Sequence, residues 1–399
     1  MKILIAHNRY CSPGGEDEVF LQESELLRRA GHEVLEYTAH NSEILEAGIL
    51  NKAKMAGRTF WATSSVAQLR SVLRREEPDL AHFHNTFPLI SPAAYYACQQ
   101  EGVPVVQSVH NARMVCPAAN FYRAGHVCED CLGRVVPWPG ILHGCYRNSR
   151  LQTAVVAGML AGHRILGTWR NRVDVYVVFT EFYRRKLMQA GLPSEKIFVK
   201  PHFLPADPGV KQKIGEYVLF VGRLAPEKGV RTLLEAFALL QKEIPLHIVG
   251  DGPLRTEMET QKGRSGLSRL SLHGRLPREQ TLEFMRGARF LIFPSECPET
   301  FGLAMIEAFA CGVPVIASRL APVTDIVADG KTGLHFTTGD ANDLAAKVDW
   351  ALTHASEMET MGRAARAEYL AKYTAERNYQ LLMEMYRRAQ NAPARKAAS

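Results

Sequence analysis

The chain has 399 residues, enough for two domains of ordinary size that each bury a core of their own. Hydrophobic residues make up 46% and charged residues 22%, a balance that is typical of globular proteins and excludes a largely disordered chain. Lys and Arg exceed Asp and Glu by 48 to 41, which suits a phosphate-bearing ligand, an anionic lipid surface or a plain solubilising charge.

The N-terminal residues and the cysteine content indicate the compartment. The opening MKILIAHNRY begins a strand at once and lacks the pattern of a signal peptide, and no apolar run reaches the length of a membrane span. We therefore expect a cytoplasmic protein, whose eight cysteines are thiols or metal ligands rather than disulfides. No basic stripe carries interleaved aromatic residues, so nucleic acid is not an expected partner.

Short apolar runs alternate with helical patterns through the first half of the chain. Residues 2–6 read as a strand, Gly14 and Gly15 follow in a loop, and helical periodicity covers 18–30 before a strand at 32–37. Further strands are expected at 80–84, 104–110 and 173–180. This β-α-β rhythm predicts a parallel sheet with helices on both faces.

A proline-rich stretch at 200–208 interrupts the rhythm, and we interpret it as an interdomain linker. The second half repeats the pattern, with strands expected at 217–222, 246–250, 270–273, 290–293 and 313–317 and helices at 230–242, 302–311, 340–353 and 356–373. The sequence therefore predicts two Rossmann-like domains, 1–200 and 201–374. A last helix at 375–390 is expected to pack on the first domain, and a disordered tail at 391–399 to follow it.

The segment Val221-Gly-Arg-Leu-Ala-Pro-Glu-Lys-Gly229 leads from a strand through a glycine turn into a helix. Turns of this kind are where α/β sheets bind phosphate groups. Arg223 offers a planar fork of donors and Lys228 a compact point charge, so both side chains suit one diphosphate. The alternative is an ordinary turn with two solvated basic residues.

A second segment, Glu299-Thr-Phe-Gly-Leu-Ala-Met-Ile-Glu307, places two carboxylates on either side of Gly302, which can open a helix. Ionised carboxylates only accept hydrogen bonds and therefore suit pairs of sugar hydroxyls. The N–H groups of Gly302 and Leu303, at the helix start, suit a phosphate. The alternative is that Glu299 caps the helix and Glu307 is merely solvated.

With both segments present, the sequence resembles the retaining glycosyltransferases of family 4, which have the GT-B fold of two Rossmann-like domains facing a cleft. The resemblance covers most of the chain, and Ile248-Val-Gly-Asp-Gly-Pro253, Leu272-His-Gly-Arg-Leu276 and Phe293-Pro-Ser295 support it. It implies transfer of a sugar from a nucleotide diphosphate donor to a saccharide or lipid-linked saccharide, in cell-surface polysaccharide synthesis and without a catalytic metal.

The resemblance also implies roles for single residues. Arg223 and Lys228 bind the donor diphosphate, Glu299 holds hydroxyls of the transferred sugar, and Glu307 takes the ribose. His110, at the end of the strand 104–110, contacts the donor sugar near the reacting carbon, the alternative being a core histidine bonded to a carbonyl. The further donor-binding positions are mostly backbone sites: Gly14, Gly15, Gly222, Gly250, Gly252, Arg275, Leu276, Phe301, Gly302 and Leu303.

Four cysteines, Cys116, Cys128, Cys131 and Cys145, follow the spacing C-x11-C-x2-C-x13-C within a loop-like insert at 111–150. The C-x2-C pair is typical of tetrahedral zinc, whose binding energy can order such a loop. We predict a structural zinc; the alternatives are free thiols, air-formed disulfides or an iron–sulfur cluster. His110, His126 and His143 are nearby and could replace a cysteine as a metal ligand. A subset of the family from bacterial surface-polysaccharide systems is similar in this insert.

Other function classes stay open, namely a nucleotide-sugar epimerase of similar fold and a non-catalytic zinc-containing binding protein. For transfer we expect front-face attack, because no carboxylate of the first domain stands as a nucleophile.

The segments 49–61 and 155–172 pair apolar with basic residues, which favours loose attachment to the inner face of the cytoplasmic membrane. An ordinary core helix is the alternative for 155–172.

Overall fold

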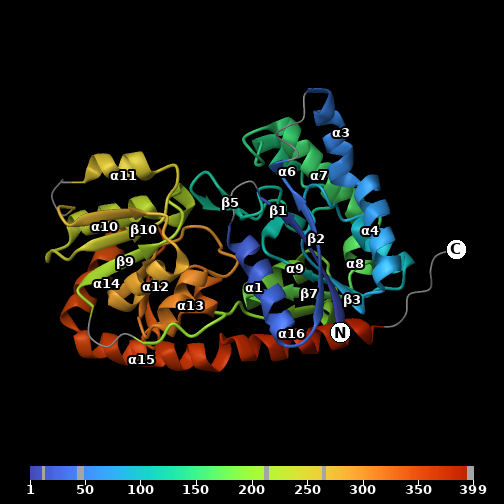
Figure 1. The fold of residues 1–399 in the computed structure, drawn as a ribbon. Coiled ribbons are helices and arrows are strands. Elements are labelled where there is room, and N and C mark those ends of the chain that lie inside the picture. Colours follow the sequence, from blue (N-terminus) through green and yellow to red (C-terminus); the bar gives the residue numbers. More distant parts are fainter. Residues whose placement is uncertain (11–13, 43–48, 211–214, 263–266, 393–399) are drawn as a thin grey trace. The chain divides into compact units, whose positions relative to one another are not determined.

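The computed structural model describes residues 1–10, 14–42, 49–210, 215–262 and 267–392, and the chain divides into two compact units (Figure 1). Unit 1 comprises Met1–Phe121, Glu129–Pro201 and the chain from Asn378 onward, and unit 2 comprises Tyr122–Cys128 and His202–Arg377. Most of the expected tail, from residue 393, lies outside the described residues.

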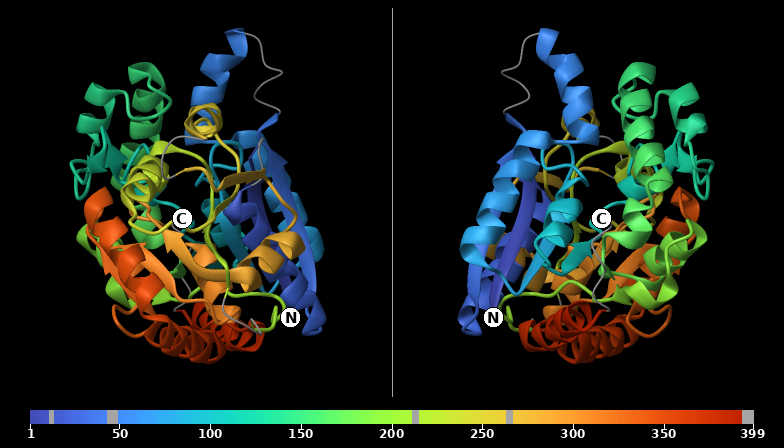
Figure 2. Two further views of the ribbon diagram at one scale, coloured as in Figure 1. Left: turned by 90° about the vertical axis from the view of Figure 1, so that its left-hand side faces the viewer. Right: turned by 90° about the vertical axis from the view of Figure 1, so that its right-hand side faces the viewer.

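Unit 1 is built on a six-stranded parallel sheet with the order β2-β1-β3-β4-β7-β8. Its strands are β1 (Lys2–Arg9), β2 (Glu33–His40), β3 (Leu80–Asn85), β4 (Val105–Ser108), β7 (Val175–Val178) and β8 (Ile197–Val199). Every residue of β3, β4 and β7 is buried, as expected for parallel strands covered on both faces (Figure 2).

Helices cover both faces of this sheet. The helices of unit 1 before α16 are α1 (Gly15–Arg29), α3 (Ile49–Phe60), α4 (Thr63–Glu76), α5 (Ala94–Gln100), α6 (Trp138–His143), α7 (Arg150–Ile165), α8 (Thr168–Asn171) and α9 (Glu181–Gln189). Helix α16 (Ala375–Gln390) also contributes, because the hydroxyl of Tyr386 lies 2.9 Å from Nδ1 of His82 on β3. The last helix therefore does return to the N-terminal sheet, as predicted.

Unit 2 repeats this construction with the strand order β11-β10-β9-β12-β13-β14, again all parallel. Its strands are β9 (Tyr217–Val221), β10 (Leu246–Val249), β11 (Leu270–Gly274), β12 (Ala288–Phe293), β13 (Val315–Ser318) and β14 (Gly333–Phe336). Its helices are α10 (Val230–Leu239), α11 (Arg255–Gln261), α12 (Arg278–Gly287), α13 (Leu303–Ala310), α14 (Ala341–Thr353) and α15 (Ala355–Lys372).

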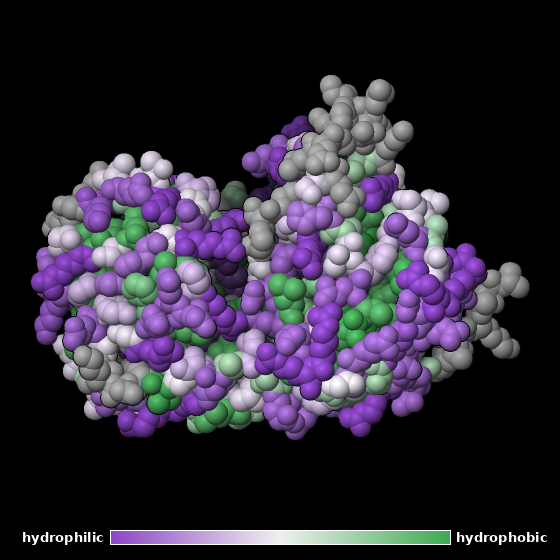
Figure 3. Space-filling model, viewed as in Figure 1, coloured by the Kyte–Doolittle hydropathy of each residue, from purple (hydrophilic) through white to green (hydrophobic). Residues whose placement is uncertain are grey.

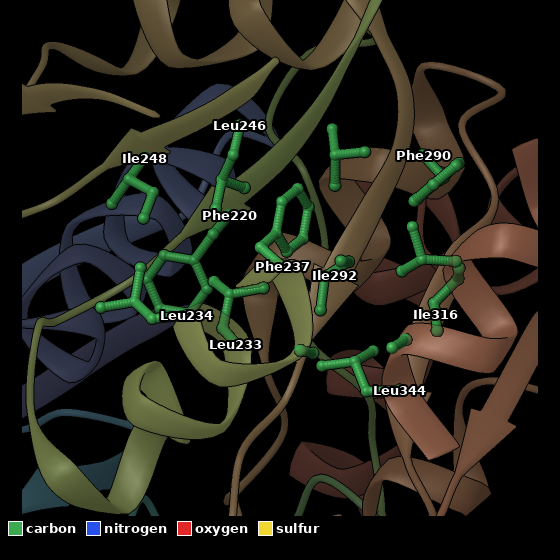
Figure 4. Packing of buried hydrophobic residues seen from close by; sticks show 14 of the residues in the cluster. Phe220, Leu233, Leu234, Phe237, Leu246, Ile248, Phe290, Ile292, Ile316 and Leu344 are labelled. Atoms are coloured by element: carbon green, nitrogen blue, oxygen red, sulfur yellow. The ribbon is translucent and has the colours of Figure 1, made fainter. Parts of the chain in front are cut away.

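The core of unit 2 lies between its sheet and helices α10 and α14. Figure 4 shows Phe220 and Ile248 on the sheet packed against Leu233 and Leu234 of α10, with Leu344 of α14 beside them. All five side chains are buried, and removing such apolar area from water is the main stabilising term of the unit. The exposed face in Figure 3 is largely hydrophilic, with apolar residues in scattered patches.

The predicted fold class, two parallel α/β units, is confirmed, but two local predictions were wrong. The insert at 111–150 is not a plain loop, since it contains β5 (Tyr122–Arg123), β6 (His126–Val127) and α6. These elements are too short to leave a periodic signal. Strand β4 ends at Ser108, so His110 follows it in the loop. Lys200, the first residue of the stretch interpreted as a linker, is fully buried.

In the part of the chain that the structure describes, no helix is long and apolar enough to cross a bilayer.

Candidate active site

The sheet of unit 2 reverses its strand order between β9 and β12, because β10 extends the sheet beside β9 and β13 extends it beside β12. The carboxyl ends of these two strands form the topological switch point, where open α/β sheets bind ligands. Both sequence motifs begin there. Arg223 follows β9 by two residues, and the loop that carries Glu299 follows β12.

Glycines allow the loops at this edge to touch backbone to backbone. Gly229 has a φ of +67°, and a Cβ atom there would lie 1.9 Å from the carbonyl oxygen of Pro294 in the loop after β12. A Cβ atom on Gly250 would lie 1.8 Å from the carbonyl oxygen of Gly222, and one on Gly252 would lie 2.5 Å from that of Leu224. Close packing between loops therefore already requires glycine at these positions.

Lys228 and Glu299 form an ion pair across the switch point. The Lys228 Nζ atom lies 2.5 Å from Oε1 of Glu299, and the two side chains are 27% and 12% exposed. The hydroxyl of Ser295 donates to the same carboxylate oxygen at 2.5 Å. Glu299 therefore does not cap helix α13, the alternative considered for it, but faces the loop after β9.

The pKa of Lys228 follows from this pairing. Burial on its own lowers the pKa, but the Glu299 carboxylate, aided by Cys297 and Glu227, raises it above the ordinary value of a lysine. The ammonium group is thus charged throughout the neutral range. A partly exposed cation fixed at a switch point can bind an anionic ligand, provided that the ligand competes with Glu299.

Arg223 is the more accessible of the two predicted cations. Its side chain is 65% exposed, and its Nη2 atom lies 2.6 Å from Oε1 of Glu227, four residues along the chain. An exposed ion pair of this kind is weak and exchanges its partner at little cost. Arg223 and Lys228 therefore lie on the same turn, each held by a carboxylate.

The second carboxylate of the motif, Glu307, lies on α13 and is 13% exposed on its side chain. The guanidinium of Arg278, at the start of α12, is 3.6 Å from its Oε1 atom. Gly302 precedes α13 with a φ of +92°, where an added Cβ would clash with Met305 and Phe293. Glu299 and Glu307 thus have different ionic partners, Lys228 and Arg278.

The other predicted donor contacts divide by exposure. Arg275, after β11, is exposed, and Leu276 and Leu303 are partly buried. Phe301 is 3% exposed and packs edge-on against the ring of His202, with the ring centroids 5.1 Å apart. The side chain of Phe301 is therefore a packing residue, and its backbone alone can face a ligand.

Unit 1 has its own reversal of strand order, between β1 and β3. Gly14 and Gly15 lie exposed at the start of α1, just beyond β1, and the N–H of Gly14 donates to Asp17 in a capping arrangement. Nearby, a cavity of about 50 Å³ opens beside His110. Its polar lining includes Tyr10, Asn85, Gln107, His110, Asn111 and Arg113.

His110 is buried, and its Nε2 atom lies 2.9 Å from Nδ1 of His84. The sequence did not predict the contribution of Glu23, whose Oε2 atom lies 3.5 Å from Nε2 of His84. The missed signal is the pair of alternate histidines on β3, because a buried strand seldom carries two imidazoles without a polar partner. Burial also raises the pKa of Glu16, at the start of α1, to about 7.

The cysteines of the insert fall in both units. Cys128 belongs to unit 2, while Cys116, Cys131 and Cys145 belong to unit 1. Among the described residues, the only group of three potential ligands with all atoms within 4.8 Å is Glu23, His82 and His84. The zinc site stays a prediction.

Comparisons with known proteins concern the family and the fold of the chain. Residues 13–207 match the family model "Glycosyltransferase Family 4", and residues 207–368 match "Glycosyl transferases group 1". A D-rhamnosyltransferase of Pseudomonas aeruginosa is 32% identical over 41% of this chain and 44% of its own length. A 2-deoxystreptamine glucosyltransferase of Streptomyces kanamyceticus is 28% identical over 78% of this chain and 77% of its own.

Similar solved structures include HepE from Anabaena in complex with UDP, at a TM-score of 0.71 and 18% identity over 96% of this chain and 99% of that one. This likeness concerns the fold. The chain matches less than half the length of the first curated relatives. The two family models together, however, run from residue 13 to residue 368. The chain therefore belongs to the glycosyltransferases of the family 4 type, with the GT-B fold.

Proposed function

We propose that the protein transfers a sugar from a nucleoside diphosphate-sugar to a saccharide or lipid-linked saccharide, with retention of configuration. The observation that carries this proposal is the Lys228–Glu299 pair at the switch point of unit 2, 2.5 Å apart and partly open to solvent. HepE, which shares the fold, has been solved with UDP and with UDP-glucose, which supports a nucleotide-sugar as donor.

Donor binding would use the charges that now neutralise one another. The diphosphate takes Lys228 and Arg223 as its cations, and Glu299 is released to accept hydrogen bonds from hydroxyls of the transferred sugar. As the glycosidic bond breaks, negative charge grows on the leaving diphosphate, where the two fixed cations stabilise it. The leaving phosphate oxygen takes the acceptor proton in front-face attack.

The acceptor is proposed to bind on unit 1. The cavity beside His110 is lined by amide, phenol and guanidinium groups, which suit the hydroxyls of a saccharide. The similar D-rhamnosyltransferase and glucosyltransferase act, by their names, in sugar transfer. A role in cell-surface polysaccharide synthesis fits a saccharide acceptor of this kind.

Attachment to an anionic membrane surface is part of the proposal, because one region of unit 1 is basic, apolar and free of acids. Residues 131–173 contain six arginines and no Asp or Glu: Arg134, Arg147, Arg150, Arg164, Arg170 and Arg172. Trp138 on α6 is 52% exposed, and Ile165 at the end of α7 is 74% exposed. The Arg164 guanidinium bonds the Arg134 carbonyl, which places the end of α7 beside the start of this segment.

Sedimentation with anionic vesicles tests this attachment. Binding at low salt that weakens at high salt is expected, and Trp138→Ser with Ile165→Ser should reduce it. Leu370→Ser is the matched control, because Leu370 is 51% exposed but lies on α15 in unit 2. Binding that is equal on neutral vesicles would contradict an electrostatic surface. The side chains of 49–54 lie outside the described residues.

A structural zinc at Cys116, Cys128, Cys131 and Cys145 completes the proposal, and the C-x2-C spacing supports it. Elemental analysis of freshly reduced protein should find about one zinc per chain, as in four-thiolate sites. Four freely titrating thiols without metal would rule the site out.

Calorimetry tests the donor site directly. Uridine, guanosine and adenosine diphosphate sugars are titrated in turn, and one base is expected to bind in the micromolar to millimolar range. Lys228→Met should abolish this binding, while Arg231→Ala should preserve it, because Arg231 pairs with Glu257 of α11 and not with a carboxylate of the candidate site. If none of these donors binds, the proposed function is wrong.

A further inference from the structure

Behind His110, unit 1 contains a chain of buried polar groups that joins three elements. Lys200, which follows β8, donates to Oε1 of Glu23 on α1. The other oxygen of Glu23, Oε2, lies 3.5 Å from Nε2 of His84 on β3. Nδ1 of His84 lies 2.9 Å from Nε2 of His110. The chain therefore runs from a fixed cation to the histidine that borders the cavity.

The whole chain is removed from water. The side chains of Lys200, Glu23 and His84 are inaccessible to solvent, and His110 is 9% exposed. Oε2 of Glu23 and Nε2 of His84 are both buried, and neither has a hydrogen-bond partner among the described residues, although the two atoms lie 3.5 Å apart. Two otherwise unpaired polar atoms that face each other in a dry interior satisfy one another if one of them carries a proton.

The protonation state of the imidazoles limits where the proton between Glu23 and His84 can lie. Burial, with added repulsion from His82, His110 and His7 and from the Lys200 ammonium, lowers the pKa of His84 well below its ordinary value. Burial and Lys200 likewise lower the pKa of His82 to about 3. Near neutral pH, His84 is therefore neutral and carries a single ring proton, on one nitrogen or the other.

Only one placement of that proton satisfies the chain. With the proton on Nε2, His84 donates to the Glu23 carboxylate, and its Nδ1 atom accepts from Nε2–H of His110. With the proton on Nδ1, the lone pair of His84 Nε2 would face the carboxylate oxygen in a buried site. The first arrangement pairs both atoms, and the second leaves two acceptors opposed.

We propose that Glu23, acting through His84, fixes His110 in the tautomer that carries its proton on Nε2 and keeps Nδ1 as a hydrogen-bond acceptor. Glu23 and His84 are then positioning residues, and His110 is the group that meets the substrate. The catalytic consequence rests on the proposed function: a neutral His110 accepts a hydrogen bond from a sugar hydroxyl and does not act as an acid. The tautomer itself does not depend on that function.

A metal site is the competing explanation, since Glu23, His82 and His84 bring three potential ligand atoms within 4.8 Å. The charges and bonds around the group oppose it. The Lys200 ammonium already neutralises the Glu23 carboxylate. His82 uses both ring nitrogens, with Nδ1 at 2.9 Å from Tyr386 and Nε2 at 2.8 Å from Ser108. A cation would have to enter beside a buried ammonium group and displace bonds at His82.

Nitrogen-15 NMR of the imidazole rings tests the proposal in the intact chain. In the wild type, His110 should show a protonated Nε2 and an unprotonated Nδ1. In Glu23→Gln, Lys200 holds the amide oxygen, so the amide NH₂ group faces His84 and donates to it. His84 then donates from Nδ1 to His110, and the proton of His110 is expected to move to Nδ1.

Glu25→Gln is the matched control, because Glu25 is 53% exposed on the same helix and its loss changes the charge equally. This variant should keep the wild-type tautomer. A proton on Nδ1 of His110 in the wild type would overturn the proposal, and this result needs no variant to fold. An unchanged tautomer in a folded Glu23→Gln variant would overturn it as well.

Kinetics separate this proposal from the proposed function. Where transfer is observed, Glu23→Gln should lower kcat by about tenfold or more and change the donor KM less, because His110 presents a donor where an acceptor is needed. If Glu23→Gln moves the proton of His110 but leaves kcat unaltered, Glu23 is not a positioning residue for transfer. A moved proton in a protein that transfers no sugar would uphold the chain and refute the activity.

Discussion

Lys228 and Glu299 neutralise each other at the switch point of unit 2, and this pairing decides how the site can respond to a ligand. The ion pair is partly exposed, so its stabilising energy is small, and a diphosphate with two negative charges can replace the carboxylate. Arg223 is available to the same ligand because its own partner, Glu227, is on the same short turn. Binding thus exchanges carboxylates for phosphate oxygens around two cations.

The first prediction concerns these cations. Arg223→Ala and Lys228→Ala should each lower kcat/KM by at least about a hundredfold, because each removes a charge directed at the leaving diphosphate. Arg231→Ala, which removes an exposed cation from α10, is the control and should stay near wild type. Steady-state kinetics of the two site variants and of the control measure these changes in kcat/KM. Near wild-type activity in both site variants would refute the phosphate assignment.

A second prediction concerns Glu307. Glu307→Gln should raise the donor KM more than it lowers kcat, because contacts to a ribose change little between the bound donor and the transition state. Donor saturation curves at fixed acceptor measure both constants. A loss confined to kcat would assign Glu307 to the chemistry instead.

Residue types and spacing were enough to select the candidate site residues of unit 2, because Arg223, Lys228, Glu299 and Glu307 lie within two continuous segments. They did not predict the network behind His110. Glu23 and Lys200 are 177 positions apart and meet only in the folded unit. A buried lysine also has no signal of its own in a proline-rich stretch, which is why it was assigned to a linker.

At the scale of elements, the loops at the switch point are held by glycine contacts. Gly229 ends the turn after β9 and lets it rest on the loop after β12, while Gly250 does the same between the loops after β10 and β9. The positions of Arg223 and Lys228 therefore depend on backbone packing as well as on their own ion pairs. Gly250 and Gly252, which were predicted to approach the donor, are already required for this packing between loops.

The third prediction follows from that contact. Gly229→Ala should destabilise the protein by about 2 kcal/mol or more, because it combines a left-handed backbone with an overlap against Pro294. Chemical denaturation measures this loss in the free energy of unfolding. Gly158→Ala is the control, because Gly158 lies exposed on α7 with open space around its Cβ position, and alanine favours a helix there. An unchanged midpoint for Gly229→Ala would contradict the contact.

Many strands were predictable from their apolar runs, and α10, α14 and α15 lie close to their expected ranges. No range was predicted for helices α4, α9, α11 and α12. Strands β8 and β14 were missed, since three or four residues among prolines and glycines give no period to detect. The hairpin β5–β6 was missed for the same reason, and its assignment to unit 2 depends on tertiary contacts alone.

For the whole molecule, the two units share one plan: a six-stranded parallel sheet whose strand order reverses once, with candidate site residues at the carboxyl ends of the strands. Cations and carboxylates gather at this edge in unit 2, whereas histidines and a small polar cavity mark it in unit 1. An enzyme that joins a charged donor to a polyhydroxyl acceptor needs both kinds of site.

The measurement that tests the account most directly is release of nucleoside diphosphate from a panel of nucleotide-sugars, with and without saccharide acceptors. The account predicts release that depends on acceptor, a product with the anomeric configuration of the donor, and loss of both in Lys228→Ala. Isomerisation of the donor sugar without acceptor would indicate an epimerase. Binding without any turnover would indicate a binding protein, and either result would contradict the proposed transfer.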